Sequence, residues 1–201
     1  MPIENTVLRA IRERRSIYRY SPGPVPDEMV QAILEAGRWA PSWGNTQPWE
    51  FIVVKNETTK REICDIAKST LIANKNIEGA SLIVVICVNP KVDPYHFIED
   101  GAVATHNMAL AAHSLGLATY WIGIYNAQNS QRSVESRVRK ALNIPQTHRV
   151  IAILPIGTPE YKIEKERKWL RDMVHHDRYG NTMLSPAGAT ESRDSSKSSK
   201  R

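Results

Sequence analysis

The stretch SLIVVICV, residues 81–88, decides the fold class, because seven apolar residues follow Ser81 without any polar alternation. A strand of this kind is buried on both faces. Its length suits a strand and falls far short of the roughly 18 apolar residues that a membrane-spanning helix needs. We therefore expect a protein built in layers around this strand.

On both sides of this stretch, strand patterns alternate with helix patterns. Further strands are expected at WEFIVV (49–54), LATYWIG (117–123) and RVIAILPIG (149–157). Helical spacing of apolar residues predicts helices over about 4–13, from the N-cap Asp27 to before Pro41, from 58 or 59 to about 71, over about 99–115 and around 134–142. This order indicates an α+β or α/β layered fold with a mixed central sheet flanked by helices.

The composition is that of an ordinary globular domain. Of the 201 residues, 41% are hydrophobic and 24% are charged, and 27 basic against 21 acidic residues give a net charge of +6. Such an excess suggests an anionic partner, namely nucleic acid, a membrane surface or a phosphorylated ligand. Residues 185–201 are rich in Ser and Lys and contain four basic and two acidic residues, so they hold +2 of that charge. We expect a domain over 1–184 and a disordered tail over 185–201.

Several classes of protein are excluded by what the sequence lacks. The N-terminus has no uncharged apolar region, so we expect no secretory signal, and Cys64 and Cys87 form no CxxC pair. These features favour buried thiols in a soluble, cytoplasmic protein. The sequence contains no GxGxxG, GxxxxGK[ST] or GxSxG motif. His106 and His113 are separated by about 10 Å on one helix face, so we expect no metal site.

Three segments carry candidate binding residues. In RERRSIYRY (12–20), Arg14, Arg15 and Ser16 follow a helix end and can bind a terminal phosphate, although basic runs are commonly solvated surface. The loop PSWGNTQPW (41–49) offers amides and tryptophans that suit the edge and face of a heteroaromatic ring, while Trp49 fits the core better. At the strand end Trp121-Ile122-Gly123, the glycine lets a ligand approach a backbone N–H.

Taken together and in order, these segments resemble the FMN-dependent nitroreductase family of NAD(P)H:nitroreductases and flavin reductases. The resemblance rests on RRSIYRY, PVPDE and LEAGRWAPSWGNTQPWEFIVV, then on GLATYWIGIYN and RVIAILPIGTP, and finally on KERKWLRDMVHHDRYG. It covers about residues 5–180. The last segment is similar to the family's C-terminal arm, which we expect here over 163–175 and ending near His176.

The resemblance implies an α+β homodimer with a domain-swapped arm and FMN bound at the interface. Arg14, Arg15 and Ser16 would hold the phosphate and ribityl end, with Arg167 and Lys165 closing from the arm. Pro41, Ser42, Trp43 and Asn45 would come from the partner chain and contact the flavin. Ile122 and Gly123 would face the flavin ring, with a backbone N–H near N5. The full set of expected cofactor contacts is Arg14, Arg15, Ser16, Tyr18, Pro41, Ser42, Trp43, Asn45, Gln47, Ile122, Gly123, Lys165 and Arg167.

One position departs from the family pattern, and a second is aligned poorly. Members commonly carry a basic residue two positions after the serine, where this chain has Tyr18 followed by Arg19. The tyrosine hydroxyl or the neighbouring arginine can take over that contact. Asn74 is the candidate for touching the flavin pyrimidine.

The implied activity is ping-pong electron transfer from NAD(P)H through FMN to nitroaromatic, quinone or similar acceptors. The cofactor carries this chemistry, so we name no catalytic acid, base or nucleophile on the protein. One alternative is another flavin reaction on the same fold, such as reductive dehalogenation or flavin breakdown. A further alternative is a protein without turnover that binds flavin or nucleic acid.

Overall fold

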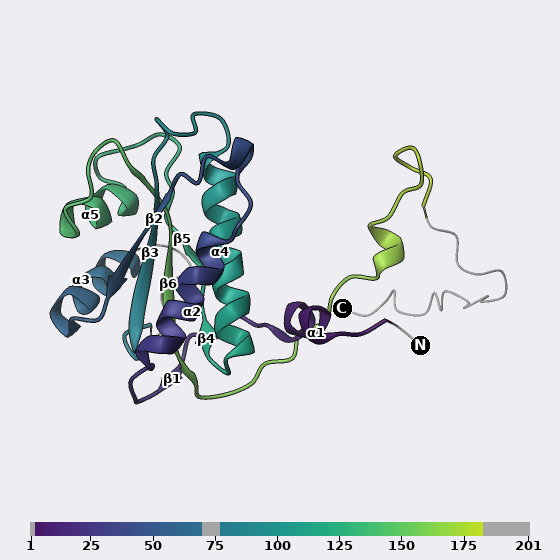
Figure 1. Ribbon diagram of the computed structural model, residues 1–201, viewed down its shortest axis with the longest axis horizontal. Helices are drawn as coiled ribbons and strands as arrows, with labels where there is room; N and C mark the ends of the chain where they lie inside the picture. Colours follow the sequence, from purple (N-terminus) through teal and green to yellow (C-terminus); the bar gives the residue numbers. More distant parts are fainter. Residues whose placement is uncertain (1–2, 70–76, 183–201) are drawn as a thin grey trace, which may run out of the picture. The chain divides into compact units, whose positions relative to one another are not determined.

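The structure is a computed structural model that describes residues 3–69 and 77–182 (Figure 1). The chain forms two compact units, residues 1–163 and 164–201. Asn74 and the predicted tail over 185–201 lie outside the described residues. Among the residues described, no helix has both the length and the apolar composition to cross a lipid bilayer.

The first unit is organised around an antiparallel sheet. Its strands are β1 (Tyr20–Ser21), β2 (Trp49–Val54), β3 (Leu82–Val88), β4 (Ala118–Thr119), β5 (Ile122–Gly123) and β6 (Arg149–Pro159). β3 lies between β2 and β6, and both β4 and β5 pair with β6. Because β3 and the β4–β5 run pair with overlapping residues of β6, they lie on its opposite edges. An isolated parallel bridge between Ser16 and Thr119 gives the sheet its mixed character.

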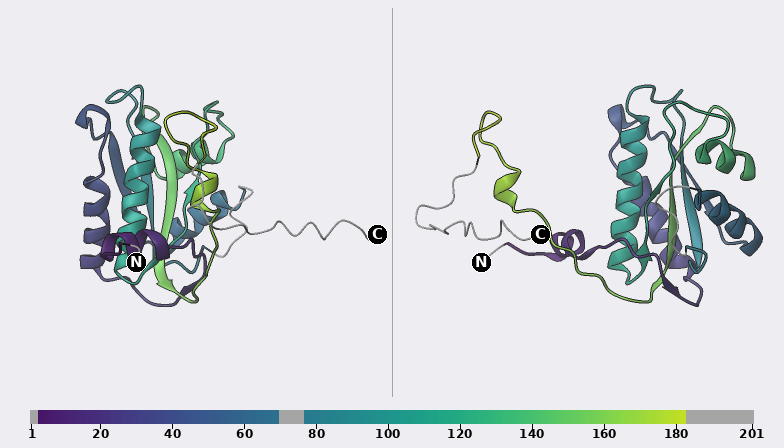
Figure 2. Two further views of the ribbon diagram at one scale, coloured as in Figure 1. Left: turned by 90° about the vertical axis from the view of Figure 1, so that its right-hand side faces the viewer. Right: turned by 180° about the vertical axis from the view of Figure 1, so that it is seen from behind.

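β3 is the buried strand that the sequence predicts, with every residue from Leu82 to Val88 at most 2% exposed. Its side chains alternate between two apolar clusters, as strand geometry requires. Val84 and Ile86 pack in one cluster with residues of α2 and α4, and Ile83 and Val85 pack in the other with residues of α3 and α5. Figure 2 shows these two helix pairs on opposite faces of the sheet. The result is the expected layered α+β fold.

Five α-helices are present among the described residues of this unit. They are α1 (Thr6–Glu13), α2 (Asp27–Arg38), α3 (Glu57–Ala67), α4 (Phe97–Ser114) and α5 (Val134–Ala141), with a short 3₁₀ turn, η1, at Trp43–Asn45. Asn5, Asn56 and Ser133 cap α1, α3 and α5 by accepting backbone N–H bonds. All five helices therefore form where apolar spacing predicts them.

The predicted N-cap of α2 is wrong. Pro26 occupies the cap position without a side-chain hydrogen bond, and Asp27 is the first helical residue. The Asp27 carboxylate accepts a hydrogen bond from Lys55 at the end of β2 instead. An acidic residue in the first turn also interacts favourably with the helix dipole, so the aspartate still supports the helix start.

The predicted strand over 117–123 is two short strands, because its pairing with β6 is interrupted. β4 and β5 share one register, in which Thr119 faces Ile156 and Ile122 faces Ile153. That register puts Tyr120 opposite Pro155, which has no N–H to donate. The interruption divides the strand but keeps both parts on the same edge of β6.

The second unit is described from 164 to 182. It contains the 3₁₀ turn η2 (Leu170–Asp172) and an antiparallel bridge between His175 and Thr182. The His176 N–H donates to the Asn181 carbonyl at 2.7 Å. The segment predicted as a charged arm is thus mostly irregular, and closes into a small loop at its end.

Candidate functional site

The segment after α1 lies along the outer edge of β4. Ser16 bridges Thr119 in parallel fashion, and the Ile17 N–H donates to the Thr119 carbonyl at 3.0 Å. Since β4 and β5 occupy the same edge of β6, this pairing brings Arg14–Ser16 to the edge that carries Ile122–Gly123. Two sequence motifs about 100 residues apart are thereby neighbours along one edge.

The backbone of Gly123 is directed outward at this edge. Ile122 faces Ile153, Gly123 faces Ala152, and the Ile124 N–H donates to Ile151 at 3.2 Å. Antiparallel pairing alternates along a strand, so Ile122 and Ile124 bond to β6 while the Gly123 N–H points away from it. Gly123 is exposed. Its N–H is therefore placed to donate to a ligand at the edge.

Ile122 contributes differently from its neighbour. Its side chain is 1% exposed and packs in the cluster that includes Val138 and Ile144. Only the backbone of Ile122 lies at the edge, so its buried side chain anchors the strand. Gly123 supplies the accessible N–H.

Arg15 has an unsatisfied donor at the same edge. Its Nη1 donates to the Arg14 carbonyl at 2.8 Å and to the Arg12 carbonyl. These bonds satisfy carbonyl groups at the end of α1. Its Nε is buried and has no partner among the described residues. A buried N–H without an acceptor is costly, and an anionic oxygen would satisfy it. The site therefore fits the phosphate of a cofactor such as FMN.

Arg14 lies close to two histidines of α4, His106 and His113. Burial, with the charge of Arg14 as a second cause, lowers the pKa of His106. Burial also lowers the pKa of His113, where the charge of Glu13 opposes the shift and those of Arg14 and Arg15 add to it. Both imidazoles are thus neutral at neutral pH, and the positive charge here comes from the arginines. No cluster of metal-ligating side chains occurs among the described residues.

Tyr18 is partly occupied by aromatic packing. Its ring meets the rings of Tyr120 and Tyr161 edge to face, with centroids 5.8 and 6.1 Å apart. Arg19 is exposed, and its carbonyl accepts from the Glu160 N–H at 3.2 Å. Of the two candidates for the missing basic contact, Arg19 has the more exposed side chain.

Loop 41–47 is built by its own polar side chains and by left-handed backbone. Gly44, Asn45 and Gln47 have φ values of 53°, 58° and 50°. Ser42 Oγ accepts the Gln47 N–H at 3.0 Å, and the Gln47 amide donates to Asn45 Oδ1 at 3.3 Å. Pro41 is exposed, like Asn45 and Gln47. The predicted amide cluster is therefore present as one exposed turn, while Trp49 is buried in the core, as predicted.

The start of α4 anchors this loop. The Trp43 N–H donates to both carboxylate oxygens of Asp100, at 3.1 and 3.2 Å, and Asp100 is 5% exposed. Burial raises the pKa of Asp100, and the Trp43 N–H opposes that shift. The half-exposed Trp43 ring lies edge to face with Tyr95, at 5.6 Å. Asp100 has no sequence signal of its own, because a single aspartate in a helix is usually solvated.

The two groups of candidate residues lie toward different ends of α4. Loop 41–47 is held at Asp100, whereas Arg14 acts on both His106 and His113. These histidines follow Asp100 by six and thirteen residues of helix, which is about 9 and about 20 Å. Lys165 and Arg167 belong to the second unit, where both are exposed and Arg167 Nη1 donates to the Glu166 carbonyl at 3.1 Å.

Comparison with known proteins gives this fold and these motifs a family. The model described as the nitroreductase family matches residues 11–80 and 68–158. A protein of Archaeoglobus fulgidus with the provisional name NADH dehydrogenase/NAD(P)H nitroreductase is 32% identical over 178 residues, which span 86% of this chain and 98% of that protein. An iodotyrosine deiodinase of Nematostella vectensis is 24% identical over 174 residues, or 75% of this chain and 66% of the deiodinase.

A solved structure agrees with these sequence matches. A provisionally named nitroreductase of Desulfovibrio desulfuricans, crystallised in complex with FMN, superposes with a TM-score of 0.72 at 30% identity. The superposition covers 88% of this chain and 99% of that one. With a family match over most of its length and the same fold, the chain belongs to the nitroreductase family.

Proposed function

We propose that this protein is an FMN-dependent oxidoreductase that passes electrons from NAD(P)H to nitroaromatic, quinone or similar acceptors. The observation that carries the proposal is the outer edge of β4–β5, which brings together Arg14–Ser16 and the outward N–H of Gly123. When bound, FMN supplies the redox chemistry, taking a hydride from NAD(P)H and passing two electrons to the acceptor in a ping-pong cycle.

The residues of this edge would have distinct tasks. Arg14, Arg15 and Ser16 would hold the FMN phosphate, and the buried Nε of Arg15 is a donor ready for it. The Gly123 N–H would donate to the flavin ring, where a fixed donor stabilises the negative charge that reduction brings. Backbone and amide groups suffice for these tasks, so no general acid or base is assigned.

We further propose that the working unit is a homodimer. α1 buries none of its residues, although Val7, Leu8 and Ile11 are apolar and exposed. An unpartnered apolar face of this kind fits a subunit interface. Loop 41–47 is held about 9 to 20 Å along α4 from the two histidines beside Arg14, which suits a loop that serves the flavin of the partner chain. Lys165 and Arg167 would join the phosphate from the arm.

A second candidate is reductive dehalogenation of an aromatic substrate. It is favoured by the similarity to the iodotyrosine deiodinase of Nematostella vectensis over 75% of this chain. The two candidates share FMN and differ in the acceptor. Turnover of a halotyrosine without turnover of nitroaromatics or quinones would favour dehalogenation.

Anaerobic stopped-flow spectroscopy tests the proposal. Purified protein reconstituted with FMN is mixed with NADH or with NADPH, and the flavin absorbance is followed. We expect rapid bleaching by at least one nicotinamide and recovery on addition of a quinone or nitroaromatic. Protein that takes up no FMN, or whose FMN neither nicotinamide reduces, would contradict the proposal.

A further inference from the structure

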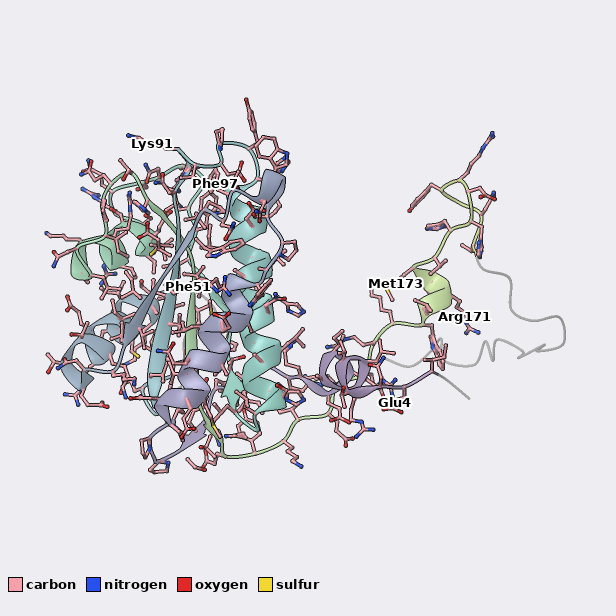
Figure 3. All side chains as sticks on the ribbon, in the orientation of Figure 1. Glu4, Phe51, Lys91, Phe97, Arg171 and Met173 are labelled. Atoms are coloured by element: carbon pink, nitrogen blue, oxygen red, sulfur yellow. The ribbon has the colours of Figure 1, made fainter. Side chains whose placement is uncertain are left out.

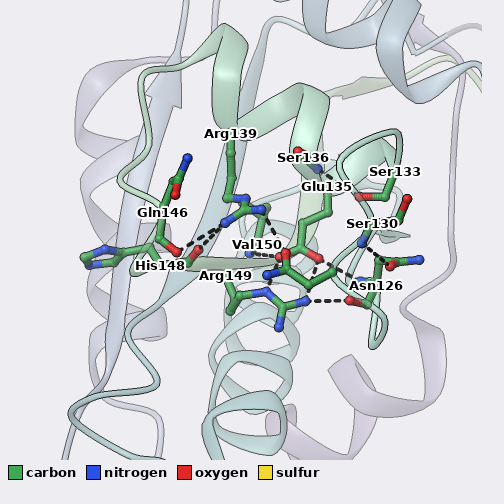
Figure 4. A network of polar contacts seen from close by, with 11 residues as sticks. Asn126, Ser130, Ser133, Glu135, Ser136, Arg139, Gln146, His148, Arg149 and Val150 are labelled. Carbon is green, nitrogen blue, oxygen red and sulfur yellow. Dashed lines mark hydrogen bonds and ion pairs between the residues drawn. The ribbon is translucent and has the colours of Figure 1, made fainter.

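Glu135 is a buried carboxylate that neither the motifs nor the proposed cofactor contacts account for. It lies in the first turn of α5 and is 0% exposed. Its two oxygens accept four N–H groups: Arg149 Nε at 2.6 Å and Nη2 at 2.8 Å, the Asn126 N–H at 2.8 Å, and the Val150 N–H at 3.1 Å (Figure 4). So many bonds to one carboxylate indicate a fixed structure.

Arg149 completes the arrangement from β6. Its Nη2 also donates to the Asn126 carbonyl at 2.6 Å, so both backbone groups of Asn126 are bound by this ion pair. The guanidinium carbon lies 4.5 Å from the centre of the Tyr125 ring. The hydrogen bonds from Glu135 raise the pKa of Arg149. We call Glu135, Arg149 and the backbone of Asn126 the clamp.

The clamp closes the end of the β5–β6 ladder. Ile124 forms the last described bond of this ladder, to Ile151, and Asn126 would follow in the same register opposite Arg149. Instead of pairing with the β6 backbone, Asn126 bonds to the two side chains of the ion pair. The chain that leaves Gly123 is therefore held by β6 at Ile124 and by the clamp two residues later.

Tyr125, whose ring lies beside the Arg149 guanidinium, contacts the end of α4 that holds loop 41–47. The Tyr125 ring lies 6.0 Å from the ring of Phe97, edge to face. Phe97 is the first residue of α4, and Figure 3 shows it at the end of that helix. Asp100, which holds Trp43, follows within the next turn. Tyr125 thus links the Arg149 guanidinium to the first turn of α4, where Asp100 holds loop 41–47.

Stability alone is a weak reason for such a pair. Removing two charges from water is costly, and apolar side chains of similar volume often replace a buried ion pair without loss of stability. What apolar side chains cannot do is bind the N–H and the C=O of Asn126 at once. A fixed backbone direction beyond Gly123 is therefore the property that this pair adds.

We propose that Glu135, through Arg149 and Asn126, is a positioning residue that fixes the direction of the Gly123 N–H and thereby sets how readily bound flavin is reduced. The proposal rests on the proposed function for its effect on the cofactor. The fixing of segment 122–126 is a property of the protein alone, so the two parts can be measured separately.

The test compares the double variant Glu135→Leu/Arg149→Met with the wild type and with Val138→Ala. The double variant removes both charges together, so neither is left buried and unpaired. Val138 is on the same helix and is fully buried, but it is not part of the clamp. Val138→Ala therefore controls for simple loss of packing.

The first measurement is amide hydrogen exchange of the FMN-free protein. We expect the amides of segment 122–126 to exchange at least tenfold faster in the double variant than in the wild type. In Val138→Ala they should exchange at the wild-type rate after correction for the change in global stability. Unchanged exchange in the double variant would show that the clamp does not fix this segment, and would overturn the proposal whether or not FMN binds.

The second measurement is the midpoint potential of bound FMN together with its rate of reduction. We expect the equilibrium constant for flavin reduction to be tenfold lower in the double variant. This lowers the midpoint potential by about 30 mV for a two-electron couple. The KM for the nicotinamide should be unchanged. A wild-type potential in the double variant, with faster exchange, would contradict the positioning role. FMN uptake failing in the wild type as well would contradict the proposed function instead.

Discussion

The outer edge of β4–β5 and loop 41–47 are both candidate flavin contacts, but they are built in different ways. The edge is held by strand pairing, and its chemical group, the Gly123 N–H, is backbone. The loop is held by side chains, through Ser42 to Gln47 and through Asp100 to Trp43. Any strand on β6 would present an outward N–H, whereas the loop depends on particular residues. We therefore expect the edge to tolerate changes in its own side chains, outside the clamp, that the loop does not.

The largest effect is expected from removing the donor at the edge itself. Gly123→Pro deletes the N–H that points away from β6, and proline is tolerated where a strand makes no ladder bond. We expect flavin reduction to slow by about 10² to 10³, as for loss of one donor that stabilises developing charge. The measurement is stopped-flow reduction at saturating nicotinamide.

Gly123→Ala is the matched control, because it keeps the N–H. An added Cβ would find its nearest atom, Trp121 Nε1, at 3.7 Å, which is ordinary contact. We expect near wild-type reduction. Equal loss in both variants would show that space at Gly123, rather than its N–H, is what matters.

A smaller effect is expected from breaking the anchor of the loop. Asp100→Ala leaves the Trp43 N–H without its acceptor and should cost about 1–3 kcal/mol of folding free energy. Asp100→Asn keeps a side-chain oxygen and should lose less. Thermal unfolding and an FMN titration of both variants check this. If Asp100→Ala bound FMN as tightly as the wild type, the loop would not be a flavin contact.

The change that should affect the flavin least concerns two thiols of the core. Burial raises the pKa of Cys64 to about 11 and that of Cys87 to about 12, from an ordinary value of 9.0. Between about pH 9 and these values the unfolded chain has lost protons that the folded chain still holds, so stability falls as pH rises. Each thiol contributes at most about 1.4 kcal/mol per pH unit.

Urea unfolding at pH 8 and pH 10 measures this slope. The double variant Cys64→Ala/Cys87→Ala should lose less stability over that interval than the wild type does. An identical slope in the two proteins would mean that the thiols do not contribute. Both cysteines should also resist thiol reagents in the folded protein at pH 8, because they are buried and protonated.

The sequence predicts the layers and the edge motifs because local pattern determines them. Unbroken apolarity fixes β3 as the buried centre, and the strand sequence before Gly123 places the glycine at a strand end. The break at Tyr120 depends on Pro155 opposite, and the pairing of Asp27 with Lys55 depends on the end of β2. Such partners are distant in the chain, so spacing alone could not indicate them.

The supports of the site are harder to predict than its contacts. Asp100 and Glu135 are single acidic residues in helices, and in the sequence they look like solvated surface. Only the fold shows that Trp43 and Asn126 direct their N–H groups at them. The homodimer and the roles of Lys165 and Arg167 rest on the family resemblance and stay predictions.

The central claim is that the edge beside β4 binds the FMN phosphate. Its most direct test is the dissociation constant of FMN for Arg15→Ala, with Arg19→Ala as the control. Arg15 has a buried Nε donor that finds no partner within residues 3–69 and 77–182, whereas Arg19 is exposed four residues further on. We expect at least tenfold weaker binding for Arg15→Ala, with the difference shrinking at high salt, and a smaller change for Arg19→Ala. Wild-type affinity in Arg15→Ala would contradict it.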